Sequence, residues 1–452
     1  MTLARFLYRT YGGSYRLQQW LSLHITPAGA LLSAAVIMPG LFGLLIFKTS
    51  LLKIFTLAIG LGMVSLISNF LPFSAAVKVM RILPEAVTAD APSSYDIELT
   101  NMGPRVQKGL TLFEQTIDPR PDLNTLLSRA EPDEHLRNAW DRKTLVFRWY
   151  WLIRKKKKAE FKPLALPDLP PGETVRIRVD ITARHRGYID FDGVFLARPD
   201  ILGIFRRTCR IRHPQRLLVL PRRYHLPLPE QFSSRQYQPG GISQASSIGN
   251  STEFISLRPY RPGDPLKNIH WRSFAKTGEL IIKEFEDEFF VRQALIIDTD
   301  LTIQNETVFE AAISISASFV STLQGHESIL DLMFAGSRVY SFSTGRGLSH
   351  SEKLLEVLAC LEPRKKGSIS DVRANLEQKI GRFSGAVCVF LDWTCEHKTL
   401  VEQFILRKIP LFVVVIKDRR LPFDETGPAQ TCGAGNFRVI EAEEVMEKAG
   451  QS

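Results

Sequence analysis

The sequence predicts three folded parts: an apolar N-terminal helical hairpin, a β-sandwich and a doubly wound α/β domain. Two long uncharged stretches lie near the N-terminus, alternating strand patterns follow, and after residue 292 short apolar runs alternate with amphipathic helical patterns. At 452 residues the chain exceeds the usual size of one domain. We expect an N-terminal segment with the hairpin at 1–83, a sandwich at 84–225, a linker with a second hairpin at 226–292 and the α/β domain at 293–452.

The first part is predicted to be a transmembrane hairpin. Residues 25–47 and 54–73 contain no charged side chain. A helix over residues 25–47 would be about 35 Å long, which is enough to cross the ~30 Å hydrocarbon layer of a bilayer. A cleaved signal peptide would have a shorter apolar core, of about 7–15 residues, and no second span directly after it. The short connection between the stretches favours a tight antiparallel pair of spans.

Charge and cysteine content predict the side of the membrane. Basic residues flanking the hairpin outnumber Lys48 and Lys53 in its turn, which favours cytoplasmic termini. The five cysteines form no Cys-x-x-Cys pair and their number is odd, so we expect reduced, buried thiols. We therefore expect a multi-pass protein of the inner (cytoplasmic) membrane with its soluble domains in the cytoplasm. The net charge of +11 suits an anionic membrane surface or an acidic partner, and general solubility accounts for it equally well.

The second part has the pattern of half-buried strands. Residues 174–181, TVRIRVDI, place apolar side chains on one face and charged side chains on the other. Similar candidates, separated by Pro and Gly clusters, lie at 95–99, 110–116, 145–151, 188–197 and 217–220. These strands predict a β-sandwich of immunoglobulin-like type. The polar, Pro-containing residues 118–142 are expected to form a loop or short helix on its rim.

A basic run at Arg154–Lys158, RKKKK, interrupts this pattern. Consecutive cations could bind the phosphates of nucleic acid or of an anionic lipid surface. A solvated hairpin tip is the simpler interpretation, because charge runs are usually exposed and no aromatic residues alternate with this one to stack on bases. We expect no nucleic-acid binding.

The third part alternates buried strands with amphipathic helices. Residues 294–298, ALIID, form an apolar run that ends in Asp, and residues 306–323 carry apolar side chains at helical spacing. Further strands are predicted at 329–334, 338–342, 386–391, 411–416 and 437–440, and further helices at 351–361 and 398–407. This alternation predicts a doubly wound sheet, in which ligands bind beyond the carboxyl ends of the strands.

Two of these strand ends carry carboxylates, Asp298 and Asp392. After Asp298 the oxygen-bearing side chains alternate, with Asp300 and Thr302. Such a loop could hold a hard cation such as Mg²⁺ with waters completing its shell. The alternative is that Asp298 and Asp392 only accept hydrogen bonds from loop amides.

Residues 253–288 hold the most specific pattern of the chain. A Gly-Asp turn at 263–264 precedes Ile269, Trp271 and Phe274, which we expect to alternate inward along a strand. Thr277 and Gly278 would reverse the chain into an antiparallel strand, leaving Asp264 able to pair with arginine. Ser273-x-x-Lys matches a nucleophile motif, but the predicted strand would point its two side chains to opposite faces. The sequence contains neither a His-Glu-x-x-His zinc motif nor a P-loop.

This pattern resembles domain-of-unknown-function family 58. The matching residues are Arg258, Tyr260, Gly263, Asp264, Ile269, Trp271 and Ser273. A second family pattern is similar to Arg186–Gly187 followed by Asp200–Phe205. The loop at Asp298 also resembles the metal-ion-dependent adhesion site of von Willebrand factor A domains, although Asp300 and Thr302 replace its two serines. The resemblance implies a von Willebrand factor A-like C-terminal domain in a bacterial or archaeal protein often encoded beside MoxR-type AAA+ ATPases.

These features together predict an interaction protein that is not an enzyme. We expect a membrane-anchored scaffold or adaptor that recruits a protein partner, with a MoxR-type AAA+ ATPase as the partner that the resemblance implies. The alternative is a metal-dependent enzyme that uses Asp298, Asp300 and Asp392. Binding of anionic lipid or nucleic acid through residues 154–158 ranks last.

Overall fold

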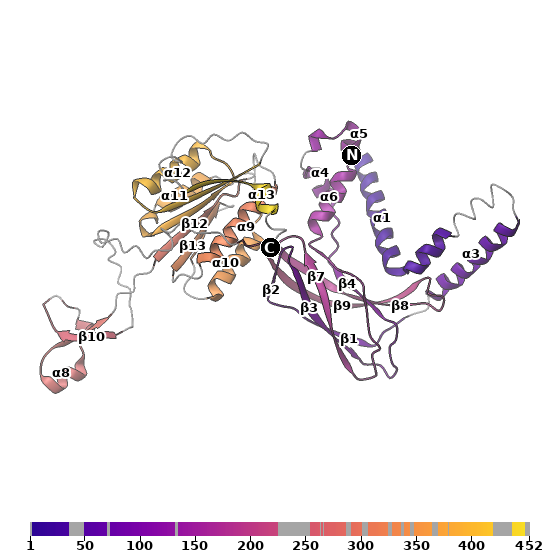
Figure 1. Cartoon of the computed structure of the whole chain (residues 1–452), viewed down its shortest axis with the longest axis horizontal. Helices are drawn as coiled ribbons and strands as arrows, with labels where there is room; N and C mark the ends of the chain where they lie inside the picture. Colours follow the sequence, from indigo (N-terminus) through magenta and orange to yellow (C-terminus); the bar gives the residue numbers. More distant parts are fainter. Residues whose placement is uncertain are drawn as a thin grey trace. The chain divides into compact units, whose positions relative to one another are not determined.

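A computed structural model describes the chain except residues 1, 36–48, 70–72, 132–133, 225–253, 263, 265, 286–290, 301–305, 324–327, 336–338, 344–347, 364–368, 378, 419–435 and 448–452. It has a mixed α/β fold with several sheets (Figure 1). The chain divides into two compact units. The first comprises Met1–Arg222 and Leu355–Leu361, and the second comprises Arg223–Leu354 and Glu362–Ser452.

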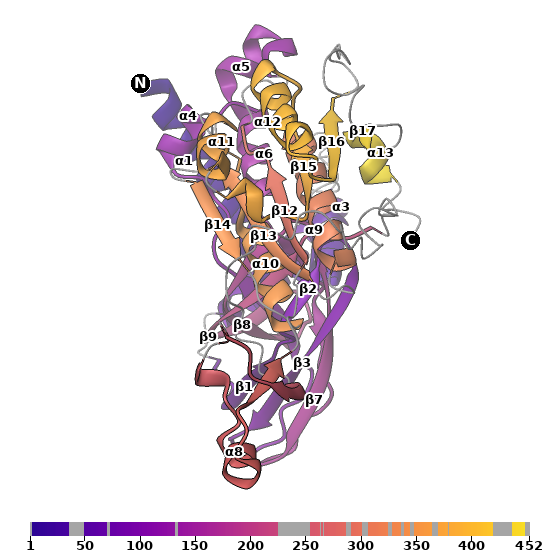
Figure 2. The same cartoon turned by 90° about the vertical axis from the view of Figure 1, so that its left-hand side faces the viewer.

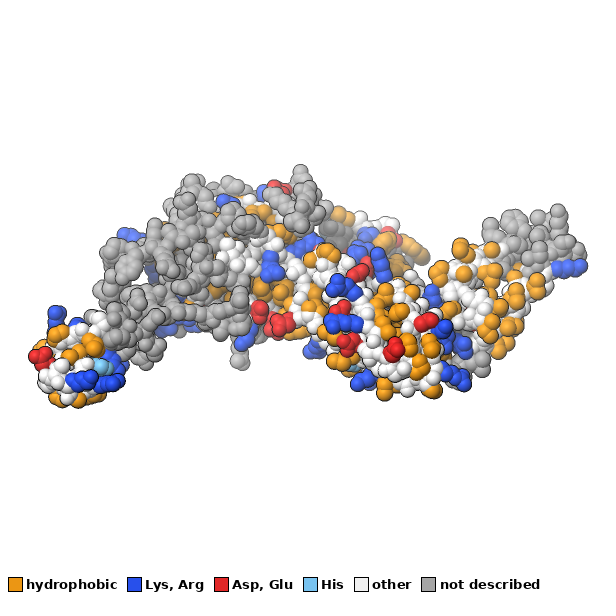
Figure 3. Space-filling model, turned by 60° about the horizontal axis from the view of Figure 1, so that its bottom comes forward, with side chains coloured by type: hydrophobic (Ala, Val, Ile, Leu, Met, Phe, Trp, Pro, Cys, Tyr) orange, Lys and Arg blue, Asp and Glu red, His pale blue; other side chains and the backbone are white. Residues whose placement is uncertain are grey.

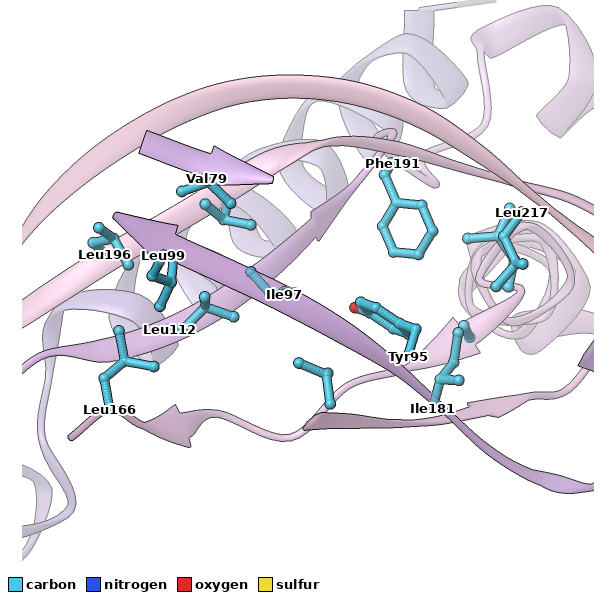
Figure 4. Close-up of a cluster of buried hydrophobic side chains, with 14 of the residues drawn as sticks. Val79, Tyr95, Ile97, Leu99, Leu112, Leu166, Ile181, Phe191, Leu196 and Leu217 are labelled. Atoms are coloured by element: carbon cyan, nitrogen blue, oxygen red, sulfur yellow. The ribbon is translucent and has the colours of Figure 1, made fainter. Parts of the chain in front are cut away.

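Two sheets in the first unit share one hydrophobic core. One sheet has the order β1 (Val77–Ile82), β3 (Pro92–Asn101), β7 (Thr174–Ala183), β5 (Ala159–Glu160), and the other has the order β2 (Ala86–Thr88), β9 (Arg206–Leu220), β8 (Gly187–Pro199), β4 (Thr111–Thr116), β6 (Leu164–Ala165). Ile97 and Leu99 of β3 meet Phe191 and Leu196 of β8 in this core (Figure 4). Along β3 the inward positions are every second residue, because successive side chains of a strand point to opposite faces.

A helical insertion in this unit departs from the predicted pattern. It contains α4 (Leu123–Ser128), η1 (Glu134–Leu136), α5 (Ala139–Thr144) and α6 (Val146–Lys156). The predicted strand at 145–151 is therefore wrong, and so is the predicted hairpin tip, because the basic run occupies the last turn of α6 and the residues after it. Trp149 of α6 is buried and packs edge-on against Tyr8 of α1 (Thr2–His24), with ring centroids 5.8 Å apart.

The N-terminal segment contradicts the predicted transmembrane hairpin. In the part of the chain that the structure describes, no helix combines the length and the apolar composition that crossing a bilayer requires. The helix α1 ends at His24, and Thr26 then donates from Oγ1 to the carbonyl of Gly203 at 2.6 Å and accepts from the amide of Gly29. These polar contacts tie the start of the first predicted span to the β8–β9 turn. The predicted location at the inner membrane stays a prediction.

The second predicted span coincides largely with α3 (Thr49–Asn69). Its Ser65 is buried and donates a hydrogen bond to the buried carboxylate of Asp200, in the β8–β9 turn. Several apolar side chains of α3, including Leu57 and Val64, are exposed. An apolar surface of this kind usually contacts another molecule.

The second unit contains a six-stranded sheet with the order β14 (Val339–Ser343), β13 (Ser328–Ala335), β12 (Val291–Ile297), β15 (Gly385–Phe390), β16 (Leu411–Lys417), β17 (Phe437–Glu441). All neighbouring pairs are parallel except β13 with β14. The chain runs from β12 to β13 on one side and later to β15 on the other, so the order reverses between β12 and β15. Such a switch point is where ligands bind in open parallel sheets.

Helices cover both faces of this sheet (Figures 1 and 2). On one face, α11 (Ile369–Glu377) and α12 (Cys395–Leu406) pack on alternate strand residues, among them Ala294 and Ile296. On the other face lies α9 (Glu306–Leu323). Its Phe319 packs edge-on against Phe412 of β16, with ring centroids 5.6 Å apart. The same part of the chain also contains α10 (Leu348–Cys360), the 3-10 turn η3 (Ile380–Arg382) and α13 (Ala442–Glu447).

The cysteines are only partly as predicted. In the described part of the chain, Cys209, Cys360, Cys388 and Cys395 take part in no disulfide. Cys388 is buried as predicted, Cys209 is half-buried, and Cys360 and Cys395 are exposed, so the predicted burial is wrong for these last two. Cys432 lies outside the described residues.

Candidate functional site

The first candidate site lies at the carboxyl ends of β12 and β15. Asp298 directly follows β12, and Asp392 follows β15 by two residues. Because these two strands are parallel neighbours, their ends meet at the switch point of the sheet. The predicted carboxylates therefore follow neighbouring strand ends.

The Asp298 carboxylate is buried and accepts several hydrogen bonds. Its Oδ1 accepts from the amide of Asp300 at 2.9 Å, and its Oδ2 accepts from the amide of Leu391 at 3.4 Å. The imidazole Nε2 of His397, also buried, lies 3.2 Å from Oδ2. Asp298 therefore joins the ends of β12 and β15 to the first turn of α12.

His397 is a member of this site that the sequence did not reveal. Its Nδ1 accepts from the amide of Thr394 at 3.1 Å, while the Thr394 side chain accepts from the His397 amide, which completes a capping box at the start of α12. An amide can only donate, so Nδ1 carries no proton and Nε2 is the donor to Asp298. The signal available in the sequence was Thr-x-x-His before a helix.

The other predicted metal ligands are arranged less compactly. Asp392 is half-buried, and its Oδ1 accepts from the amide of the next residue, Trp393, at 2.8 Å. Thr302 lies outside the described residues. Among the residues that are described, no group of three or more His, Cys, Asp or Glu side chains is arranged to hold a metal ion. The Mg²⁺ site at Asp298, Asp300, Thr302 and Asp392 stays a prediction.

The second candidate site is the segment of residues 254–285, which we name the signature module. Its strands β10 (Phe254–Pro259) and β11 (Ile281–Phe285) are antiparallel, and between them lie η2 (Leu266–Asn268) and α8 (Trp271–Thr277). Ile269 and Ile282 are buried and form an isolated bridge. The amide of Tyr260 donates to the carbonyl of Leu280, so the ends of the inserted turn are held together.

A bidentate ion pair closes the first turn of the signature module. Both guanidinium Nη atoms of Arg258 donate to the carboxylate of Asp264 at 2.7 Å, and the amide of Arg261 donates to Asp264 Oδ2 at 2.9 Å. The hydrogen bond from Arg258, followed by the one from Arg261, lowers the pKa of Asp264 to about 2. The predicted arginine–Asp264 pair is thus present. Gly263 lies outside the described residues.

The ion pair predicts how the module responds to acid. Because the folded-state pKa of Asp264 lies below its unfolded value of about 3.9, the pair stabilises the module above that value and is lost as the pH falls through about 2. We expect the indole NMR signal of Trp271 to keep its native position at pH 3 in the wild type. The Asp264→Asn variant lacks the ion pair between Arg258 and residue 264 at every pH. Its Trp271 signal should therefore be shifted or broadened already at pH 7.

The matched control is Glu279→Gln, because Glu279 is an exposed carboxylate of the same module. This variant should leave the Trp271 signal unchanged. If the Trp271 signal of the wild type moves between pH 5 and pH 4, a group other than Asp264 controls the response to acid, and the prediction is contradicted.

The helix α8 overturns the predicted strand at residues 269–274. Ile269 does point inward, but Trp271 is 61% exposed and Phe274 is 38% exposed. Their rings meet edge-on with centroids 6.1 Å apart. The predicted inward alternation is wrong for both aromatic residues, which lie on the surface of the module.

The helix also removes the geometric reason against the Ser273-x-x-Lys motif. Positions 273 and 276 of a helix lie about one turn apart rather than on opposite faces. The Ser273 hydroxyl, however, lies 2.6 Å from Nδ1 of His270 at the start of α8. This hydrogen bond joins the first turn of the helix to the residue that precedes it.

One comparison with known proteins matches a stretch of the chain that includes the signature module. Residues 256–436 match the family model described as "Protein of unknown function DUF58". The uncharacterized protein YeaD of Bacillus subtilis (strain 168) is 24% identical over 295 residues, which is 64% of this chain and 66% of that protein. The chain thus spans slightly less than two thirds of the relative that it matches.

Two solved structures show weaker likeness. Proximal thread matrix protein 1 from the mussel byssus is 11% identical, with a TM-score of 0.28 over 36% of this chain and 46% of that one. The manganese-loaded TRAP protein of Plasmodium vivax is 14% identical, with a TM-score of 0.25 over 35% of this chain and 71% of that one. Likeness at this level carries no conclusion on function. The family-model match and the Bacillus subtilis relative support the DUF58 family for residues 256–436 of this chain.

Proposed function

We propose that this chain is a non-enzymatic adaptor that recruits a protein partner through its DUF58 region, with the exposed face of the signature module as the docking surface. In this proposal the six-stranded sheet is a von Willebrand factor A-like domain and the partner is a MoxR-type AAA+ ATPase. The observation that carries the proposal is the exposed aromatic pair on α8.

The exposed face of the module has the composition of a binding surface. Besides Trp271 and Phe274, the exposed side chains of the module include Leu257, Leu266 and Leu280, which are between 39% and 64% exposed. Tryptophan and other aromatic side chains dominate the energy of protein interfaces, because they bury a large area at low cost in conformational entropy. Monomeric surfaces normally leave such side chains isolated rather than grouped within one short segment.

Exposed basic residues on the same module indicate the chemistry of the partner. Arg261, Lys267, Arg272 and Lys276 are exposed, and so is Glu279, the one exposed carboxylate among the module residues whose side-chain exposure is described. Apolar and basic side chains lie next to one another on the module at the left of Figure 3. A partner surface with an apolar pocket and an acidic rim would complement this face.

The test is binding of the full chain to a MoxR-type ATPase from the same source. Replacing Trp271 with alanine should weaken binding at least tenfold, because truncating an interface hot spot costs about 2 kcal/mol or more. Trp140→Ala is the matched control, since Trp140 is 73% exposed but lies in the first unit, and this variant should bind as the wild type does. Calorimetric titration measures both affinities.

Two results would overturn the proposal. One is the absence of binding by the wild-type chain in titration and in copurification. The other is equal affinity of the wild-type, Trp271→Ala and Phe274→Ala chains for the ATPase, which would remove the module from the interface.

A further inference from the structure

We propose that Arg198 and Arg207, two arginines at the turn end of the β8–β9 ribbon, bind a phosphate group. The register of the two antiparallel strands places these residues directly opposite each other, next to the pair Pro199–Arg206 that closes the ribbon. All of these residues belong to the first unit of the chain. The inference goes beyond the proposed adaptor function and does not depend on it.

The two arginines continue a row of strand positions that face the core. Leu196 of β8 and Ile211 of β9 pack in the core of the sandwich, and steps of two residues lead from them to Arg198 and Arg207 on the same face. Directly opposite residues have Cβ atoms about 4.5–5.5 Å apart, and like charges in such a pair are destabilising. The fold alone therefore gives no reason for this pair, which favours a binding role.

The described part of the chain does not neutralise the two guanidinium groups. Both arginines are half-buried, and Nε of each is shielded from solvent without a hydrogen-bond partner there. Arg198 donates from Nη2 to Oε1 of Gln107 at 2.6 Å, and its guanidinium carbon lies 5.1 Å from the ring centroid of Phe73. These two partners are uncharged, and no carboxylate among the described residues forms an ion pair with Arg198 or Arg207.

The acidic residue that follows Arg198 by two positions, Asp200, is already engaged within the turn. Its Oδ1 accepts from the amide of Ile204 at 2.9 Å, and its Oδ2 accepts from the hydroxyl of Ser65. Burial, followed by the charge of Arg207, lowers the pKa of Arg198. The direction of this pKa change is the one expected of a guanidinium group that lies beside another cation and lacks a counter-ion.

The charge and shape of the pair favour phosphate over carboxylate. A phosphate monoester carries a charge of about −1.5 to −2 at pH 7, which balances two guanidinium groups, whereas a carboxylate carries one negative charge. The planar fork of each guanidinium group matches the oxygens of a phosphate. An anion between Arg198 and Arg207 would replace their repulsion with attraction.

Apolar side chains in the same turn make a lipid headgroup one source of the phosphate. Ile201 is 94% exposed and Leu202 is 44% exposed. A phospholipid bound through its headgroup could bring its acyl chains to these two residues, whereas a free phosphate would leave them in solvent. Both sources offer the arginines the same chemistry, so the experiment has an arm for each.

The experiment is a calorimetric titration of the full chain with inorganic phosphate and, separately, with dihexanoyl phosphatidic acid below its micelle concentration, at constant ionic strength. We expect a phosphate group to bind in at least one arm. Arg207→Gln and Arg198→Gln should each weaken that binding at least tenfold. The matched control is Arg212→Gln, because Arg212 lies on β9 with its side chain 80% exposed, and this variant should bind as the wild type does.

The two arms identify the source of the phosphate. Binding of the lipid at least tenfold more tightly than inorganic phosphate identifies a lipid headgroup, and equal or weaker binding of the lipid identifies a free phosphate. Circular dichroism verifies folding, which we expect of both variants because each substitution removes the repulsion between like charges. Absence of binding in both arms, or equal affinity of the wild-type, Arg198→Gln and Arg207→Gln chains, would overturn the inference.

Discussion

Replacing Glu114 with glutamine is expected to lower the free energy of unfolding of the sandwich by about 3–5 kcal/mol. The side chains of Arg81 and Glu114 are 0% and 1% exposed, with Arg81 Nη2 donating to Glu114 Oε2 at 2.7 Å. Tyr95 also donates to this carboxylate, at 2.6 Å, and burial followed by the charge of Glu114 raises the pKa of Tyr95. Glutamine would leave the guanidinium as a buried charge without its counter-ion.

Amide hydrogen exchange in β1, β3 and β8 measures this loss within the first unit. Asp96→Asn is the control, because Asp96 pairs with Arg176 at the surface and such pairs contribute about 1 kcal/mol or less. The double variant Arg81→Met with Glu114→Leu should recover part of the loss, since it leaves no charge unpaired but removes the acceptor of the buried Tyr95 hydroxyl. If Glu114→Gln and Asp96→Asn lower the free energy of unfolding equally, the buried pair stabilises the sandwich no more than a surface pair does, and the prediction is contradicted.

The strand pattern of the sandwich could be predicted because its periodicity is simple. Residues 174–181 alternate apolar and charged side chains, and β7 covers Thr174–Ala183. The same reasoning failed at 145–151, where FRWYW satisfies both a strand and a helix period. There Trp149, Leu152 and Ile153 are buried at helical spacing and pack against α1, a distant partner that local pattern does not reveal.

The prediction of a strand in the signature module failed for a related reason. Sequence reasoning assumed that Trp271 must be inside, as large apolar residues usually are. Only Ile269 and Ile282 are buried among the described side chains near α8, so the short helix has no core to cover its aromatic residues. The prediction of two membrane spans rested on the absence of charged side chains, so it overlooked the polar contacts of Thr26 and Ser65 with the β8–β9 turn.

The candidate site at the strand ends was partly predictable. A strand that ends in Asp indicates the edge of the sheet, so Asp298 and Asp392 could be named. His397 could not be linked to Asp298, because 99 residues separate the two and only the parallel pairing of β12 with β15 brings them together. Helix capping by His397 is a local feature, whereas its bond to Asp298 depends on the whole sheet.

Replacing Asp298 with alanine is expected to destabilise the second unit by about 2–6 kcal/mol. The change leaves the buried Leu391 amide and the buried Nε2 of His397 without their acceptor, and each unsatisfied buried donor costs about 1–3 kcal/mol. Asp392→Ala is the matched control. The described contact of Asp392 is with its own neighbour, Trp393, so its loss should be about 1 kcal/mol. Urea unfolding, followed by hydrogen exchange in β12 and β15, measures both.

The same pair of variants separates a structural carboxylate from a metal ligand. If Asp298 only connects strand ends, added Mg²⁺ leaves the stability of the wild type unchanged, and the two variants keep their unequal losses. If the predicted Mg²⁺ site exists, Mg²⁺ stabilises the wild type, because a ligand that binds only the folded state shifts the equilibrium towards it. Both variants would then lose that Mg²⁺-dependent increment, since each removes one predicted ligand. Equal losses for Asp298→Ala and Asp392→Ala without metal would instead contradict the role of the Asp298–His397 pair in holding this edge of the sheet.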